Sequence, residues 1–299
     1  MGRHFFSSLR VRLVALVLLA VIPAFGIILN SATARRQEAR VRAREDTLDL
    51  VRLVSSESEH LIDSARSLLT LLARLPEVQG TDPAACSARL SDLLKHYPRF
   101  VNFGVIDPDG RVTASAVPTD EPANLSDRPF FQMALRSDGF QLGHYHVGRI
   151  TGKPSFNFVL PVRDETGALK SVLFAAQEVT SLQSFLSRLN PPDGASVVVA
   201  DGSFTVLACH PGGPPAPGQR LPEPLVIILQ TGLQWDVREM AGEGGSQVLA
   251  GFVTLGGGAG SGALQVLVTL SEDVAFAPVR TAVTQDLLLL GLAFLFVVT

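Results

Sequence analysis

Two apolar runs at opposite ends of the chain constrain its architecture more than any other feature. The first, residues 13–29, is about 17 residues long and lies near the lower limit for a membrane-spanning helix. The second, residues 287–299, is about 13 residues long. A helix rises about 1.5 Å per residue, so this second run is too short to cross a hydrocarbon core of about 30 Å. We therefore expect a transmembrane helix within residues 1–30 and the truncated start of another within residues 281–299.

The segment between these runs, residues 31–280, would be tied to one membrane at both ends. That layout belongs to receptors whose output domain would follow residue 299. An A-x-A sequence at residues 32–34 also allows a cleaved signal peptide, but the first run exceeds the usual apolar core of about 7–15 residues, which favours a retained anchor. Arginines between residues 35 and 44 do not favour a cytoplasmic N-terminus. Long loops cross membranes largely regardless of charge, so we place residues 31–280 outside the cytoplasm.

Net charge and cysteine content indicate whether the chain binds nucleic acid and whether it forms a disulfide. The formal net charge is −3 over 299 residues, so the chain has no basic footprint for nucleic acid. Cys86 and Cys209 are the two cysteines, and outside the cytosol two cysteines can pair. They lie far apart in sequence and in different predicted halves, so a disulfide between them is not favoured.

Residues 31–75 contain neither proline nor glycine and predict one long helix that leaves the first span. Its apolar positions follow one another in steps of three and four, which places them in one stripe with heptad character. Pro76 ends the helix. The stripe has two interpretations of equal weight: it packs on its own domain, or it forms a homodimer seam continuous with the span. The stripe comprises Val51, Val54, Ser58, Leu61, Ala65, Leu68, Leu72 and Leu75.

Short helices and strands follow in an α+β pattern. Asp82 and Pro83 predict the start of a second helix, which ends by Pro98. Ser126-Asp127 is expected to cap a short helix at residues 128–135. Turns rich in aspartate and glycine separate strands that we expect at residues 100–106, 111–116, 141–147, 155–162 and 169–178.

A similar pattern returns about 94 residues later, beyond a boundary at residues 190–192. The matched pairs are 104–110 with 197–202, 129–131 with 224–226, and 167–179 with 262–274. Three matches at nearly one offset predict two tandem antiparallel-sheet modules. The first, with the long helix, would occupy residues 31–190 and the second residues 191–280. Coincidence among hairpins with glycine turns is the remaining alternative.

Arg128 opens the predicted helix 128–135, where the helix dipole gives a cation no structural benefit. A positive group beside free backbone N–H donors makes an anion site. Arg149 and Lys153 lie in the nearby loop 148–154. Alternatively, Arg128 pairs with a local aspartate and holds the loop closed. Glu223 stands where the second copy would carry this arginine, so we expect the pocket in the first copy.

His144 and His146 are two apart on a predicted strand, so they are expected to share a face. Two imidazoles could bind zinc, but a third ligand is not evident. A pair lining a polar pocket is favoured, and neither metal nor cofactor is expected. The glycine-rich stretch 256–262 lacks the Lys-Ser/Thr of a phosphate loop and predicts a hairpin loop. The sequence holds no nucleophile elbow, HExxH or kinase signature, so we expect no enzyme in these residues.

Taken in order, these motifs resemble a double Cache sensor domain, the extracytoplasmic PAS-like module of bacterial receptors, over roughly residues 31–280. The resemblance implies two stacked antiparallel sheets beside the long helix and a small-molecule pocket in the membrane-distal module. It also implies signalling through the spans to a histidine kinase, diguanylate cyclase or chemotaxis module. Beyond the long helix, it rests on Tyr97-Pro98, the Asp-Pro-Asp-Gly turn at 107–110, Ser-Asp-Arg-Pro-Phe-Phe at 126–131, Gly-Arg-Ile-Thr-Gly-Lys-Pro at 148–154 and Leu-Pro-Val at 160–162.

Two departures from the family pattern bear on function. Members that bind amino acids carry a Trp/Tyr aromatic pair and an aspartate after the arginine. Here Phe130 and Phe131 form the pair and Met133 replaces the aspartate, which weakens the case for an amino-acid ligand. Relatives also pair a cysteine near Cys86 with one on the second hairpin strand, where Ala114 stands, so Cys86 is expected to be free.

We therefore expect the sensory half of a bacterial inner-membrane receptor, with residues of about 31–280 periplasmic and a small anionic ligand in the distal pocket. Homodimerisation would use the long helix. Two alternatives remain: a periplasmic module that reads another protein, and a membrane-anchored periplasmic hydrolase. The expected ligand-binding residues are Arg128, Phe130, Phe131, His144, Tyr145, His146, Arg149 and Lys153.

Overall fold

The computed structural model describes residues 9–119, 123–213, 215–230, 235–241, 247–256 and 262–298. Helices and antiparallel strands are both present, as expected of an α+β chain. The helices are α1 (Leu9–Leu72), α2 (Pro76–Gln79), α3 (Pro83–His96), α4 (Pro129–Leu135), α5 (Val179–Leu186), α6 (Glu223–Gln230), α7 (Glu272–Ala275) and α8 (Ala277–Val298). The strands are β1 (Phe100–Ile106), β2 (Val112–Ser115), β3 (Gln141–Leu142), β4 (His146–Val147), β5 (Pro154–Arg163), β6 (Leu169–Glu178), β7 (Ala195–Asp201), β8 (Val206–His210), β9 (Trp235–Ala241), β10 (Gln247–Gly256) and β11 (Ala263–Ser271).

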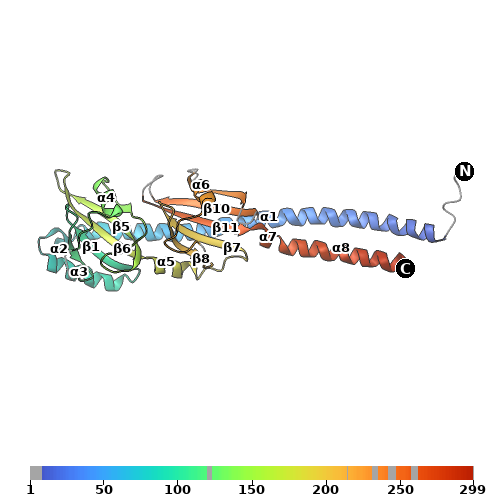
Figure 1. Cartoon of the computed structure of the whole chain (residues 1–299), viewed down its shortest axis with the longest axis horizontal. Coiled ribbons are helices and arrows are strands. Elements are labelled where there is room, and N and C mark those ends of the chain that lie inside the picture. Colours follow the sequence, from blue (N-terminus) through green and yellow to red (C-terminus); the bar gives the residue numbers. More distant parts are fainter. Residues whose placement is uncertain are drawn as a thin grey trace.

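The strands form two antiparallel sheets that follow one another along the molecule (Figure 1). The first has the order β2-β1-β6-β5-β3, with β4 also paired to β5, and the second has the order β8-β7-β11-β10-β9. Each sheet thus places its first hairpin beside its last strand in the same way, which confirms the predicted tandem repeat. We call residues 76–178 the distal module and residues 195–275 the proximal module, because both chain ends leave beside the latter (Figure 1).

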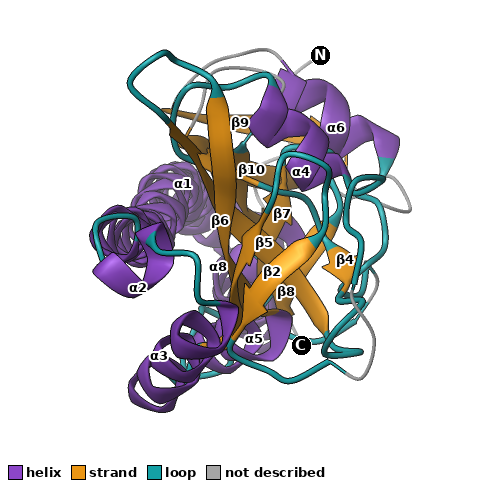
Figure 2. Cartoon of the chain, turned by 90° about the vertical axis from the view of Figure 1, so that its left-hand side faces the viewer, coloured by secondary structure: helices purple, strands orange, loops and turns teal. Residues whose placement is uncertain are grey.

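Helix α1 supports both modules. It lies along one face of the sheets, whereas α4 and α6 lie on the opposite face (Figure 2). The predicted apolar stripe faces inward: Val54, Ser58 and Ala65 are fully buried. One continuous hydrophobic core therefore joins α1 to strands of both sheets, and the intramolecular interpretation of the stripe is confirmed. Burial of each large aliphatic side chain along it contributes about 1.5–3 kcal/mol.

Strand β6 shows how one strand serves both faces of its sheet. Leu173 and Ala175 point into the core beneath α1, while Phe174 and Ala176 belong to the separate cluster beneath α4. This period of two follows from the pleat, which turns successive side chains to opposite faces. The face under α4 is the one on which the candidate site lies.

The strand expected over residues 141–147 is instead two short strands, β3 and β4, separated by residues 143–145. Gly143 still donates its N–H to the Asn157 carbonyl at 2.6 Å. The N–H of Tyr145 then bonds to the proximal module instead of to β5, which interrupts the ladder. This tertiary contact is the physical reason for the break.

The predicted cap of the helix at residues 128–135 is also wrong. The N-cap of α4 is Arg128, and no side chain caps this helix end. The Asp127 carboxylate is bound to Arg149 and so is not available as a cap. By contrast, Asp82 caps α3 as predicted, accepting from the N–H groups of Ala84 and Ala85.

Helices α1 and α8 extend side by side away from the proximal module (Figure 1), and Arg35 lies 3.6 Å from Asp286 between them. Within the described ranges, no helix combines the length and apolar character needed to cross a membrane. Residues 257–261 of the predicted glycine-rich loop lie outside the described ranges, and the flanking strands pair with Gly256 opposite Ala263. Cys86 and Cys209 are both free and buried.

Candidate functional site

A hollow of about 30 Å³ lies on the α4 face of the distal sheet. The N-terminus of α4, the loop after β4 and the inner strands β5 and β6 enclose it. That volume holds at most two or three water molecules, because each needs at least about 10–15 Å³. The described residues that line it are Asn102, Leu125, Arg128, Phe130, His146, Gly148, Arg149, Ile150, Thr151, Ser155, Asn157, Phe174 and Ala176.

Local sequence places Arg128 at this hollow. Because Pro129 follows, Arg128 is held in an extended conformation (φ −77°, ψ 134°) just before the first turn of α4. Phe130 and Phe131, both buried, anchor that turn in the core under the sheet. The Arg128 guanidinium lines the hollow and, within the described residues, makes no hydrogen bond or ion pair.

Arg149 lines the same hollow but has its charge satisfied. Its guanidinium binds both carboxylate oxygens of Asp127, at 3.0 and 2.8 Å, and also donates to the Asn124 carbonyl. These hydrogen bonds lower the pKa of Asp127 and raise the pKa of Arg149. The pair clamps the loop after β4 to the start of α4. The sequence interpretation that an arginine and a local aspartate hold the loop closed thus applies to Arg149 instead of Arg128.

The floor of the hollow is polar. Asn157, on β5, is 2% exposed, and its Oδ1 has no hydrogen-bond partner among the described residues. The side-chain amide of Asn102, by contrast, already has partners. Its Nδ2 donates to the Ser115 hydroxyl, and its Oδ1 accepts from the N–H of Val117. A buried acceptor without a donor is costly, so Asn157 is suited to a ligand or water that donates a hydrogen bond.

His146 forms one wall of the hollow. Its ring packs against Phe130 with centroids 5.5 Å apart, and its Nδ1 lies 3.1 Å from the His144 carbonyl oxygen. Since a carbonyl only accepts, Nδ1 carries the ring proton, and Nε2 of the neutral ring is an acceptor. Burial lowers the pKa of His146, and the nearby Arg128 charge lowers it further, against the opposing effect of the carbonyl.

The hollow is electrostatically positive. None of the described residues that line it is acidic, and Asp127, which lies beside it, is already paired with Arg149. Arg128 therefore contributes a positive charge that nothing in the described lining neutralises. Such an arrangement favours a small anion, because a charged hydrogen-bond donor in a partly enclosed site binds an oxyanion strongly.

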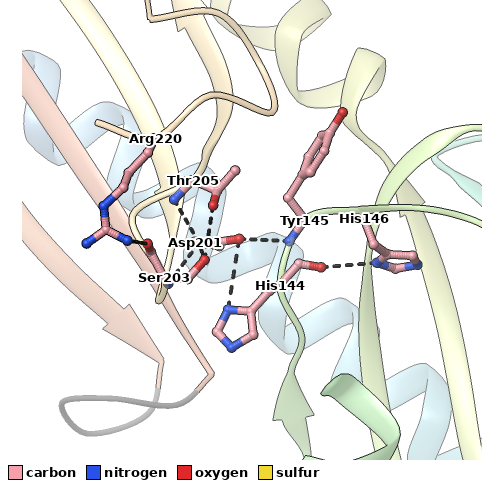
Figure 3. A network of polar contacts seen from close by, with 7 residues as sticks. All are labelled: His144, Tyr145, His146, Asp201, Ser203, Thr205 and Arg220. Carbon is pink, nitrogen blue, oxygen red and sulfur yellow. Dashed lines mark hydrogen bonds and ion pairs between the residues drawn. The ribbon is translucent and has the colours of Figure 1, made fainter. Parts of the chain in front are cut away.

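The other predicted site residues lie elsewhere. Phe131 is packed in the core beneath α4, and Lys153 pairs with Glu178 at 3.1 Å outside the hollow. His144 and His146 do not share a face: His144 and Tyr145 contact the proximal module, whereas His146 turns to the hollow (Figure 3). The structure thus brings together Arg128, Phe130, His146 and Arg149 of the predicted set.

Sequence reasoning missed Ser155 and Asn157. Both are buried polar residues in a strand whose other positions up to residue 162 are apolar, and Asn157 lies between Phe156 and Phe158. A polar side chain at every second position of a buried strand indicates a face that meets something other than core. That signal was present in the sequence.

Comparisons with known proteins identify the family. A sequence profile of the Cache domain matches residues 35–279. The chain belongs to the Cache domain family. Sporulation kinase D of Bacillus subtilis (strain 168) is 26% identical to this Cache chain over 188 residues, which cover 63% of the chain and 37% of that kinase. The chain thus spans little more than a third of the length of this relative.

Solved structures share the fold. The extracellular domain of rpHK1S-Z16 superposes with a TM-score of 0.66 at 16% identity, over 79% of this chain and 96% of that one. The ligand-binding domain of Mlp24 with asparagine gives 0.62 at 18% identity, over 82% and 98%. The ligand-binding domain of the Pseudomonas fluorescens chemoreceptor CtaA with L-isoleucine gives 0.63 at 16% identity, over 81% and 98%. These similarities establish a Cache sensor fold.

Proposed function

We propose that this Cache chain is the sensory portion of a bacterial inner-membrane receptor that binds a small anion in its distal module. The observation that carries the proposal is the Arg128 guanidinium, which lines a hollow whose described lining has no acidic residue. An anion would bind Arg128 through a charge-assisted pair. A hydroxyl on the same ligand would donate to Oδ1 of Asn157, which has no donor in the described structure.

Entry of the ligand requires the loop after β4 to open. A ligand of several heavy atoms exceeds the present hollow of about 30 Å³. The Arg149–Asp127 pair is exposed, at 41% and 62% of the two side chains, so its rupture costs little free energy. Opening frees Arg149 to join Arg128 on the ligand. Lys153 would contact the ligand only if its ion pair with Glu178 also broke.

The proposal favours anions over zwitterions. A ligand ammonium group would need a carboxylate, and the described lining offers only neutral acceptors. Mlp24 and CtaA were solved with asparagine and L-isoleucine, so amino acids remain the natural comparison. Met133, at the position where amino-acid-binding members carry an aspartate, is consistent with this preference.

The wider architecture follows from the same function. We propose that residues 1–30 and 281–299 hold membrane helices. Residues 31–190, which include the long helix and the distal module, and residues 191–280, which include the proximal module, would then lie outside the cytoplasm. The similarity to sporulation kinase D supports a histidine kinase output beyond residue 299, with diguanylate cyclase the other candidate. A homodimer through α1 would use the face opposite the buried stripe, where Leu53 and Leu71 are exposed.

A binding experiment tests the distal site. The 299-residue chain, purified in detergent, is titrated with small hydroxy- and keto-carboxylates and with L-isoleucine, while its thermal unfolding is followed. A bound ligand at 100 times its dissociation constant stabilises by about 2.7 kcal/mol. We expect stabilisation by at least one carboxylate, its loss in Arg128→Ala and its persistence in Arg136→Ala. Arg136 is a matched control because it closes the other end of α4, away from the hollow.

Two outcomes would contradict the proposal. Stabilisation that survives Arg128→Ala would retain a sensor but reject this site. No stabilisation across the whole panel would favour a module that reads another protein.

A further inference from the structure

The segment 144–146 contacts both modules at once (Figure 3). His146 lines the distal hollow, while the N–H of Tyr145 donates to Oδ2 of Asp201 in the proximal module at 2.7 Å. His144 places its Nδ1 3.9 Å from the same oxygen. Residues 144–146 therefore line the candidate ligand site and also contact Asp201 of the proximal module.

Asp201 is built into the proximal module as a rigid anchor. It ends β7, is 1% exposed, and its Oδ1 accepts from the N–H groups of Ser203 and Thr205 and from the Ser203 hydroxyl. These bonds fix the direction of the carboxylate, so that Oδ2 points out of its own turn toward Tyr145 (Figure 3). A buried carboxylate with several donors is stable only while those donors stay in place.

The surfaces around this bond are closely fitted. A Cβ atom at Gly218 would lie 2.9 Å from the Tyr145 ring, and one at Gly262 would lie 3.2 Å from the N of Leu142. The described structure gives Nδ1 of His144 no hydrogen-bond partner, although the atom is buried. We call the contact between segment 144–146 and Asp201 the joint. Because little space is free around it, a shift of this segment must either move the turn around Asp201 or break the contact.

We propose that Asp201 couples the proximal module to the distal ligand site by holding the backbone of segment 144–146. The inference rests on the proposed sensor function, because it supplies the route by which a change at His146 reaches the proximal module and α8. In this arrangement, a ligand that displaces His146 strains the Tyr145–Asp201 bond, and a proximal module that pulls on Asp201 changes the hollow. Such coupling is reciprocal.

The variant Asp201→Asn tests the contact with little change of shape. Asparagine keeps an oxygen that can accept from Ser203 and Thr205, but it then presents an NH₂ group to the N–H of Tyr145. Two donors face each other and the intermodule bond is lost. The turn itself keeps its pattern of hydrogen bonds.

Asp107→Asn is the matched control. Asp107 occupies the corresponding turn of the distal module, and its Oδ1 accepts from the N–H groups of Asp109 and Arg111 at 3.0 and 2.8 Å. The corresponding bonds at Asp201 measure 2.8 and 3.0 Å. Within the described residues, Asp107 makes no hydrogen bond or ion pair to the proximal module. Asp107 is half-buried where Asp201 is buried, and its substitution changes an equivalent turn without changing the contact to Tyr145.

Hydrogen–deuterium exchange of the 299-residue chain in detergent, without ligand, is the measurement. In Asp201→Asn we expect residues 143–147 to exchange about tenfold faster, from loss of one charge-assisted bond. We also expect faster exchange at residues 126–131 beside the hollow, while residues 203–206 keep their protection. Asp107→Asn should leave residues 143–147 unchanged.

Three results would overturn the proposal: unchanged exchange at residues 143–147, faster exchange there without any effect at residues 126–131, or the same acceleration in Asp107→Asn. Because no ligand is used, these results are independent of the titration at Arg128. Failure to find a ligand would reject the proposed site and leave the joint standing.

Discussion

At the scale of single residues, identical side chains have different roles because their neighbours differ. Arg128 and Arg149 both line the hollow, yet among the residues that the structure describes Arg149 is the one that pairs with a carboxylate. The difference lies in the backbone. Pro129 restricts the backbone of Arg128 at the N-terminus of α4, whereas Arg149 lies on a loop from which its guanidinium contacts Asp127. Whether an arginine charge in the site is paired therefore depends on where the backbone places that arginine, not on residue type.

His146 should make the stability of the chain depend on pH. Burial lowers the pKa of the folded-state imidazole, so the unfolded chain takes up a proton first as the pH falls through about 6.5. Stability is then fully present above that pH and declines below it. We expect His146→Gln to reduce the loss of stability between about pH 7.5 and 5.5, measured by urea unfolding at each pH.

His60→Gln is the control for this measurement, because His60 is exposed on α1. It should leave the pH dependence of the wild-type chain in place. An unchanged slope in His146→Gln would show that burial of this imidazole does not govern the acid sensitivity.

At the scale of elements, the part of α1 that runs beside the sheets packs on one side. Between residues 51 and 72 its inward residues join the core of both sheets, and its outward residues are mostly polar. Short helices are different: α4 depends on Phe130 and Phe131 to hold its first turn against the sheet. The position of each element therefore depends on which apolar face it buries.

Two leucines on α1 test this directly. Leu69 is 0% exposed, whereas Leu71 is 64% exposed on the same helix. We expect Leu69→Ala to lower the free energy of unfolding by about 2–5 kcal/mol, since it leaves a cavity in the core. Leu71→Ala should change it by no more than about 0.5 kcal/mol. Urea unfolding of both variants in detergent is the measurement, and a large loss in Leu71→Ala would instead indicate that the outer face is buried in a dimer.

At the scale of the whole molecule, two modules share one helix and one continuous core. The candidate site lies in the distal module, while α1 and α8 leave together beside the proximal module (Figure 1). A change in the distal module can therefore reach α8 either along α1 or through the joint at Asp201. These are two separate physical routes.

Membrane attachment is the prediction at this scale. If residues 1–30 and 281–299 hold membrane helices, the chain should stay in the membrane fraction of bacterial cells after an alkaline carbonate wash, because tens of apolar residues are buried in lipid. Removal of both segments should release it to the soluble fraction. Release of the intact chain by the wash would reject the anchors.

From the sequence alone, the α+β pattern, the tandem repeat, the apolar stripe of the long helix and the place of Arg128 at a helix start could be predicted, whereas burial of the stripe against the sheets could not. These features depend on local chemistry: hydrophobic period, proline and glycine placement, and turn residues. Only the tertiary structure decided which side chains meet. Residues 144 and 146 separate because Tyr145 leaves its own sheet to bond Asp201, 56 residues further along the chain. Lys153 leaves the site because Glu178 lies beside it. Such partners are set by packing between distant segments, which no local pattern encodes.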